Sequence, residues 1–245
     1  MISMSAHSSR QVTNGRLIWL AVFGIAMGLI EAIVVVYLRE LYFPGGFGFP
    51  LRFIPEQMLR MEILRELATI IMLVALAAIA ARTFVFRFAV FLFTFGIWDV
   101  FYYVFLKVLL DWPQSFFTWD VLFLIPITWL APILAPLVSA LTMIGFSVLL
   151  IALHRQYGEI RIGRIAWLFM AAGAGLIFYT FIVDFAGIVI KGGFVPDLAA
   201  LASNSAFQTA VSSFVPVHFD WWLFSAGEAL VILSGVVMYV KTVSK

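Results

Sequence analysis

The chain has 245 residues, of which 64% are hydrophobic and only 11% are charged. Its mean hydropathy of +1.10 is far above that of a soluble domain of this length, so the composition predicts an all-α protein with several membrane spans. The net charge is only +2 and the basic residues are scattered, which argues against nucleic acid as a partner. Cysteine is absent, which excludes disulfides, thiolate metal sites and iron–sulfur clusters.

The apolar runs predict a helix bundle with six transmembrane spans. The first run, over 17–41, is too long for the core of a cleaved signal and contains Glu31, so it predicts a retained span. Gly24 and Gly28 within it form a Gly-x-x-x-Gly pattern, which permits close packing of another helix. The six spans are expected over 17–41, 61–81, 86–110, 131–153, 165–190 and 221–240.

The polar and proline-rich stretches predict how these spans are connected. A single membrane domain over 17–240 is expected between two short tails, 1–16 and 241–245. Three long loops are expected on one side of the membrane, over 42–60, 111–130 and 191–220. Glycine and proline break the first of them.

Two shorter helices are expected within the connections. Prolines 126, 132 and 136 interrupt an apolar stretch that is longer than one span requires. This pattern predicts a short re-entrant or interfacial helix near 120–130, before span four. An amphipathic helix is expected near 197–213.

The distribution of basic residues predicts the orientation. Six spans place both tails and the short connections 82–87 and 154–164 on one side. That side holds nine of the fifteen basic residues, which are Arg10, Arg16, Arg82, Arg87, Arg155, Arg161, Arg164, Lys241 and Lys245. The positive-inside rule makes it cytoplasmic, so both termini are expected inside a plasma membrane or a bacterial inner membrane.

Acidic residues within the spans predict a functional site. Glu31, Asp99, Asp184 and Glu228 lie well inside their spans, all in the outer half of the membrane. Uncompensated, four such acids would cost on the order of 10–14 kcal/mol, so they require protons, partners, water or metal. We therefore expect one polar cavity open to the outer side.

The residue types in this cavity suggest binding of a divalent metal or another cation. Carboxylates from several helices plus one imidazole are suitable ligands, although their spacing matches no metal motif. The expected metal ligands are Glu31, Glu62, Glu66, Asp99, His218, Asp220 and Glu228. In an enzyme, hydrolytic or oxidative chemistry would use Glu31, Glu66 and Asp99 as catalytic groups. We expect no haem, iron–sulfur cluster or nucleotide, because the three histidines are dispersed and no phosphate-binding or dinucleotide motif is present.

Three other hypotheses compete with metal binding. Local pairs could neutralise the acids, joining Glu62 to Arg65, Glu31 to Arg39, and Asp99 to Lys107 directly or through Tyr103. Alternatively, the protein is a proton- or cation-coupled transporter of a small solute. A third hypothesis is an accessory subunit of a larger membrane complex. The expected partners are the lipid bilayer, a small-molecule, ionic or lipidic ligand from the outer side, and a membrane-complex partner or a second copy.

Overall fold

Helices make up most of the structure. The computed structural model describes residues 14–52, 54–158, 160–196 and 204–244. The elements within these residues are α1 (Asn14–Tyr42), α2 (Glu56–Ala80), α3 (Phe84–Leu110), β1 (Trp119–Phe123), β2 (Trp129–Pro132), α4 (Leu134–Tyr157), α5 (Arg164–Lys191), α6 (Ser205–Ser213) and α7 (Trp221–Val243). All of these helices except the nine-residue α6 are long and apolar enough to cross a membrane. The predicted all-α bundle with six spans is thereby confirmed.

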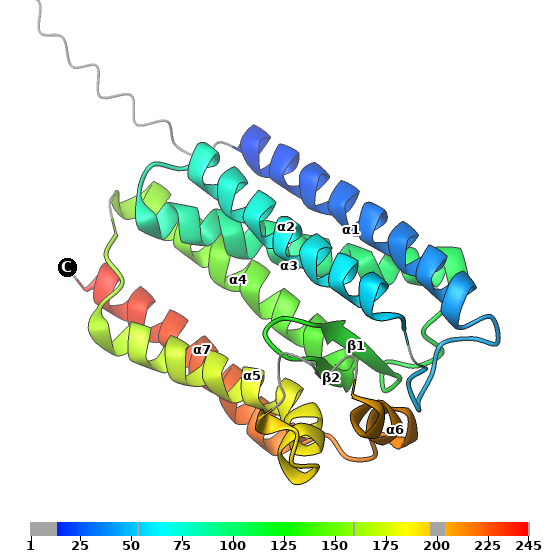
Figure 1. Cartoon of the computed structure of the whole chain (residues 1–245). Coiled ribbons are helices and arrows are strands. Elements are labelled where there is room, and N and C mark those ends of the chain that lie inside the picture. Colours follow the sequence, from blue (N-terminus) through cyan, green and yellow to red (C-terminus); the bar gives the residue numbers. More distant parts are fainter. Residues whose placement is uncertain (1–13, 53, 159, 197–203, 245) are drawn as a thin grey trace, which may run out of the picture.

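The six long helices form two groups that α4 joins. Helix α3 packs against α1, α2 and α4, while α4 also packs against α7, and α7 lies along α5 (Figure 1). The connection after α1, the two strands and α6 lie at one end of the bundle, which we call the hairpin end. Helix α1 begins and α7 ends at the opposite end, which we call the terminal end.

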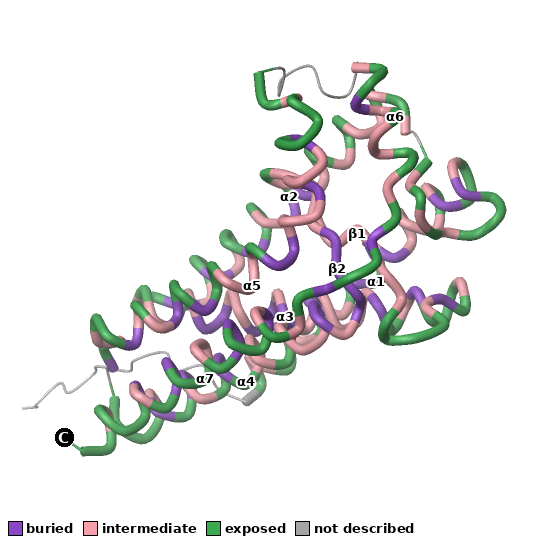
Figure 2. Tube along the Cα trace, turned by 90° about the horizontal axis from the view of Figure 1, so that it is seen from below, coloured by how far each residue is buried: buried purple, intermediate pink, exposed green. Residues whose placement is uncertain are grey.

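The helix surfaces explain why this chain belongs in lipid. Large apolar side chains such as Trp19, Ile79, Leu168 and Trp222 are exposed on the outside of the bundle. In water such a surface would associate, whereas in a bilayer it contacts acyl chains. Figure 2 shows buried, intermediate and exposed positions alternating along the helices, with buried positions also in both strands.

Small residues let the helices approach closely. A Cβ added to Gly24 would come within 3.1 Å of the Thr94 carbonyl oxygen, and one added to Gly28 within 2.9 Å of the Trp98 carbonyl oxygen. The predicted Gly-x-x-x-Gly pattern is thus the contact between α1 and α3. In the same way, a Cβ on Gly173 would lie 2.6 Å from the carbonyl oxygen of Gly227, where α5 meets α7.

The segment before α4 corrects one prediction. A short helix was expected near 120–130, but β1 and β2 form an antiparallel hairpin in which Asp120 pairs with Ala131 and Val121 with Leu130. The proline at 126 lacks the N–H that a helix requires, while β-branched and aromatic residues on either side favour strands. A hairpin also satisfies its own backbone groups through the ladder, which is what a segment tucked into a membrane bundle needs.

The other boundaries follow the predictions with small shifts. Helix α2 begins at Glu56, within the predicted loop, and the helix predicted near 197–213 is observed over Ser205–Ser213. Residues 197–203 lie outside the described residues. Asn204 caps α6 through its side chain, which accepts a hydrogen bond from the backbone N–H of Phe207.

Candidate functional site

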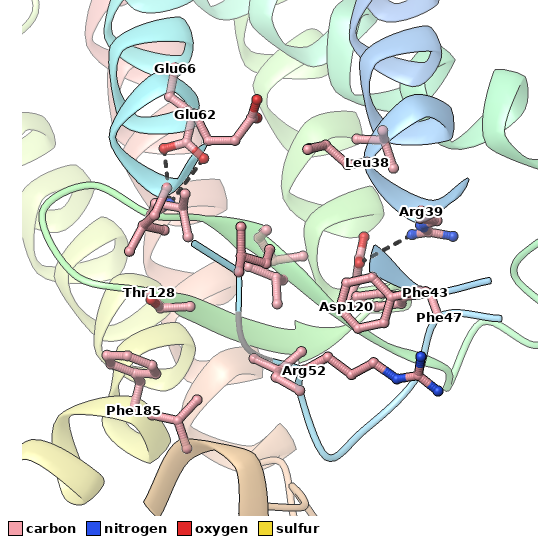
Figure 3. Close-up of a pocket in the computed structure, with 18 of the residues that line it drawn as sticks. Leu38, Arg39, Phe43, Phe47, Arg52, Glu62, Glu66, Asp120, Thr128 and Phe185 are labelled. Atoms are coloured by element: carbon pink, nitrogen blue, oxygen red, sulfur yellow. Dashed lines mark hydrogen bonds and ion pairs between the residues drawn. The ribbon is translucent and has the colours of Figure 1, made fainter. Parts of the chain in front are cut away.

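Two cavities adjoin at the hairpin. The first, which we call the hairpin chamber, has a volume of about 240 Å³ and lies between α1, α2, the hairpin and α6 (Figure 3). Its charged lining residues are Glu31, Arg39, Arg52, Glu62, Arg65, Glu66 and Asp120. The second, which we call the bundle chamber, has a volume of about 360 Å³ and lies between α3, α4, α5 and α7 beneath the hairpin. Its charged lining residues are Glu31, Asp99 and Glu228.

Arg65 holds two of the acids in the hairpin chamber. Its guanidinium lies 2.7 Å from the Glu31 carboxylate on α1 and 2.8 Å from the Glu62 carboxylate one turn earlier on α2. One cation therefore faces two carboxylates, and this group carries a formal charge of −1. The pair Glu62–Arg65 is confirmed, whereas the predicted pair Glu31–Arg39 is wrong, because Glu31 faces α2 rather than the end of its own helix.

Glu66 anchors the hairpin to α2. Both of its carboxylate oxygens accept a hydrogen bond from the backbone N–H of Leu124, at 3.1 and 2.9 Å (Figure 3). Leu124 directly follows β1, where the chain turns toward β2 and its N–H has no ladder partner. The acid thus satisfies a backbone group that would otherwise be unpaired in the membrane.

A second cation closes the far side of the hairpin chamber. Arg39 lies 3.7 Å from Asp120 on β1, and its guanidinium sits over the rings of Phe47 and Trp112, at 4.4 and 3.8 Å from their centroids. The Tyr103 hydroxyl donates a hydrogen bond to the other Asp120 oxygen at 3.2 Å. Burial raises the pKa of Asp120 from 3.8 to about 6, against the opposing effects of Arg39, the Val121 backbone N–H and Tyr103.

Two of the three acids that line the bundle chamber, Asp99 and Glu228, have no cation beside them among the described residues. The Asp99 side chain forms no hydrogen bond or ion pair with any described residue, so the predicted link to Lys107 or Tyr103 is wrong. Lys107 instead pairs with Asp111 at 2.7 Å, at the end of α3. Glu228 accepts a hydrogen bond from Ser139 through one oxygen, at 2.7 Å.

Unpartnered buried polar atoms gather at the same chamber. Three buried side-chain atoms in the described part of the chain lack a hydrogen-bond partner: Glu228 Oε2, Trp98 Nε1 and Trp129 Nε1. All three residues line the bundle chamber. The Trp98 N–H lies near the Glu31 carboxylate but outside hydrogen-bond geometry. Since buried polar groups are nearly always paired in proteins, this concentration indicates a site for a ligand or water.

The structure separates the predicted site residues. Glu31, Glu62 and Glu66 meet in the hairpin chamber, while Asp99 and Glu228 line the bundle chamber. His218 and Asp220 are exposed and line neither chamber; Asp220 caps α7 by accepting a hydrogen bond from the Leu223 N–H. Asp184, which was expected in the polar cavity, also lines neither chamber.

The donor geometry gives no support to a metal site. Within residues 14–52, 54–158, 160–196 and 204–244, no group of three or more His, Asp or Glu side chains is arranged to hold a metal ion. Two of the proposed catalytic acids are already engaged, Glu31 by Arg65 and Glu66 by Leu124. Asp99 is the one of the three without a described partner.

Four residues that shape the chambers were not among the predicted site residues. Arg39 and Asp120 form a buried pair across 81 positions of sequence, and only the fold of the hairpin brings them together. Trp98 and Trp129 resembled ordinary aromatic residues of a membrane helix and of a membrane interface. A tryptophan directly before Asp99 was the available signal, since an indole N–H in an apolar environment requires an acceptor.

Comparisons with protein families, curated proteins and solved structures find no match for this chain. The structure itself defines the class of this protein: a multi-pass helical membrane protein with two mostly apolar cavities that contain a few charged side chains.

Proposed function

We propose that this protein binds a cation in the bundle chamber and couples its movement to protons, as a transporter of a small solute. The observation that carries the proposal is the lining of the chamber. It includes the carboxylates of Asp99 and Glu228, and no lysine, arginine or histidine occurs among its described lining residues.

A carboxylate in an apolar chamber without a neighbouring cation can bind either a proton or a cation, so the two can exchange there. An ionised carboxylate in a low-dielectric interior is strongly destabilised unless a positive charge lies beside it. Asp99 has no such partner among the described residues, and its electrostatic neighbours, Glu31 and Asp120, are themselves acids. A proton or a bound cation can each neutralise it, and their competition for one carboxylate couples the two.

The adjoining chambers supply a route to this acid. Glu31, Tyr102 and Leu122 line both of them, so these three residues lie between the two cavities. The hairpin chamber lies at the hairpin end, which we propose faces outward, with both termini in the cytoplasm of a cell bounded by a plasma or bacterial inner membrane. A solute would enter the hairpin chamber and pass the Arg65–Glu31 ion pair.

The metal-dependent and accessory-subunit hypotheses remain predictions. A divalent metal would need a set of donors, which the described residues do not assemble. Neither hypothesis has a specific structural observation in its favour.

Proton flux into proteoliposomes tests the proposal. The purified full-length protein is reconstituted with an entrapped pH indicator, and outward or inward gradients of Na⁺, K⁺, Mg²⁺ and phenylpropylammonium are applied. At least one gradient should drive proton movement, and Asp99→Asn should reduce its rate by about tenfold or more, because the variant holds neither proton nor charge. Asp111→Asn is the matched control, since Asp111 caps the C-terminal end of the helix that contains Asp99 and lies outside both chambers.

Two results would contradict the proposal. One is the absence of cation-driven proton movement for all four cations in wild-type proteoliposomes. The other is equal flux in the wild type and Asp99→Asn, with Asp99→Asn purified in the same folded, monodisperse state.

A further inference from the structure

We infer that the ligand of the bundle chamber is a protonated amine on an apolar body that also carries a neutral oxygen acceptor. This inference rests on the proposed function, because it names the class of cation that the site takes.

The acids that line the chamber indicate that the ligand carries a positively charged amine. Asp99 and Glu228 lie on α3 and α7, on two walls of the chamber, and Glu228 Oε2 is a buried acceptor without a donor. An ammonium N–H supplies both the missing donor and the compensating charge. An anion would find no basic side chain among the described lining residues.

The aromatic lining selects an organic cation over an inorganic ion. Phe95, Phe123, Phe178 and Phe181 line the chamber beside Trp98 and Trp129. Their ring faces attract an ammonium ion and contact an apolar body, but they offer no lone pairs to replace the water shell of Na⁺ or Mg²⁺. The volume of about 360 Å³ lies in the range of small-molecule pockets.

The two unpartnered indole N–H groups indicate that the ligand carries an oxygen acceptor. Trp98 Nε1 and Trp129 Nε1 are buried donors without acceptors, at the same chamber as the unpartnered acceptor of Glu228. A ligand that leaves these donors unsatisfied should bind more weakly than a ligand that accepts hydrogen bonds from them. A hydroxyl or carbonyl oxygen on the ligand is therefore expected to improve binding.

Titration calorimetry on the detergent-solubilised full-length protein measures how much the positive charge and the oxygen of the ligand each add to its affinity. The probes are phenylpropylamine, its analogue with a hydroxyl on the benzylic carbon, the neutral phenylpropanol and the anionic phenylpropionate. At pH 7 the amine should bind about tenfold or more tightly than phenylpropanol, and phenylpropionate should not bind. The hydroxylated amine should bind several-fold more tightly than phenylpropylamine.

Variants assign the contacts to residues. Glu228→Gln and Asp99→Asn should each weaken amine binding by about tenfold. Trp129→Phe should reduce the preference for the hydroxylated amine, because only the Trp98 donor remains, and leave the preference for amine over alcohol intact. Glu40→Gln is the control, because Glu40 is an exposed acid of α1 that lines neither chamber.

Wild-type binding alone can overturn the inference, so it does not depend on the folding of any variant. Equal affinity for phenylpropylamine and phenylpropanol, or tighter binding of phenylpropionate, would each do so. An amine affinity that is unchanged in both folded acid variants would also contradict the inference. If inorganic cations drive proton flux while amines do not bind, the ligand class is wrong and the proposed function stands. If amines bind as described without any proton flux, the proposed transport is wrong and the ligand class stands.

Discussion

At the scale of single residues, the balance between acids and bases differs between the two chambers. In the hairpin chamber, Arg65 forms ion pairs with Glu31 and Glu62, and Arg39 forms one with Asp120. Cations therefore compensate these acids. No described cation lies beside Asp99 or Glu228 in the bundle chamber. On the proposed function, the paired acids of the hairpin chamber have a structural role, and Asp99 and Glu228 are the acids that bind the ligand.

Replacing Arg65 should expose the structural role of its ion pairs. Arg65→Gln leaves Glu31 and Glu62 facing each other in a partly buried site, so we expect the free energy of unfolding to fall by about 3–5 kcal/mol. The double variant Glu31→Gln/Arg65→Gln should recover most of this loss. Unfolding by dodecyl sulfate in mixed micelles measures both, and a double variant as unstable as the single one would contradict the assigned pairing.

Asp120 should make stability depend on pH. Its pKa of about 6 in the folded protein exceeds the value of 3.8 expected when unfolded, so the folded state binds the proton more tightly. Stability therefore rises as pH falls through 6, by about 1 kcal/mol between pH 7 and pH 5, and the gain is complete below 3.8.

Comparison of unfolding midpoints at these two pH values isolates this effect. Asp120→Asn should reduce the dependence by about 1 kcal/mol over this pH range, because the asparagine does not titrate. Asp111→Asn should leave it unchanged, since Lys107 lowers the pKa of Asp111 below 3.8 and outside this window. An Asp120→Asn profile parallel to the wild type would show that other groups cause the dependence.

At the scale of elements, the contact between α5 and α7 depends on two glycines whose backbones touch. Gly173→Ala would place a Cβ 2.6 Å from the Gly227 carbonyl oxygen, so the helices must separate, and we expect a loss of about 1–3 kcal/mol. Gly175→Ala, on the same helix with nothing within 4 Å, should be neutral or slightly stabilising. Thermal unfolding in detergent compares the two, and similar midpoints would show that the close approach does not hold the helices together.

At the scale of the whole molecule, the orientation in the membrane is directly testable because the chain has no cysteine. Gly48→Cys places a thiol at the hairpin end, at a position with nothing within 4 Å, and Ser244→Cys places one at the terminal end. A membrane-impermeant maleimide should label only Gly48→Cys in intact cells and both variants in lysed cells. Labelling of Ser244→Cys in intact cells would reverse the proposed orientation.

The spans were predictable because each is a local property of the chain. Helices α1, α3, α5 and α7 match their predicted ranges within a few residues, since a long apolar run in a bilayer must satisfy its own backbone. The hairpin was not predicted. Residues 120–130 are apolar whether they form a helix or strands, and the pairing of Asp120 with Ala131 depends on neighbours that packing supplies.

The sequence by itself determined the class of this protein and which acids are costly, because hydropathy and charge are read residue by residue. Only the tertiary structure decided which acids are neutralised. Glu31, which like Asp99 lies within an apolar helix, has Arg65 beside it because α1 and α2 present these side chains to each other. Asp99 faces a chamber without a cation among its described residues. The energy of a charge in a membrane depends on what lies within a few ångströms, and the partners that decide it are set by helix packing across long distances in sequence.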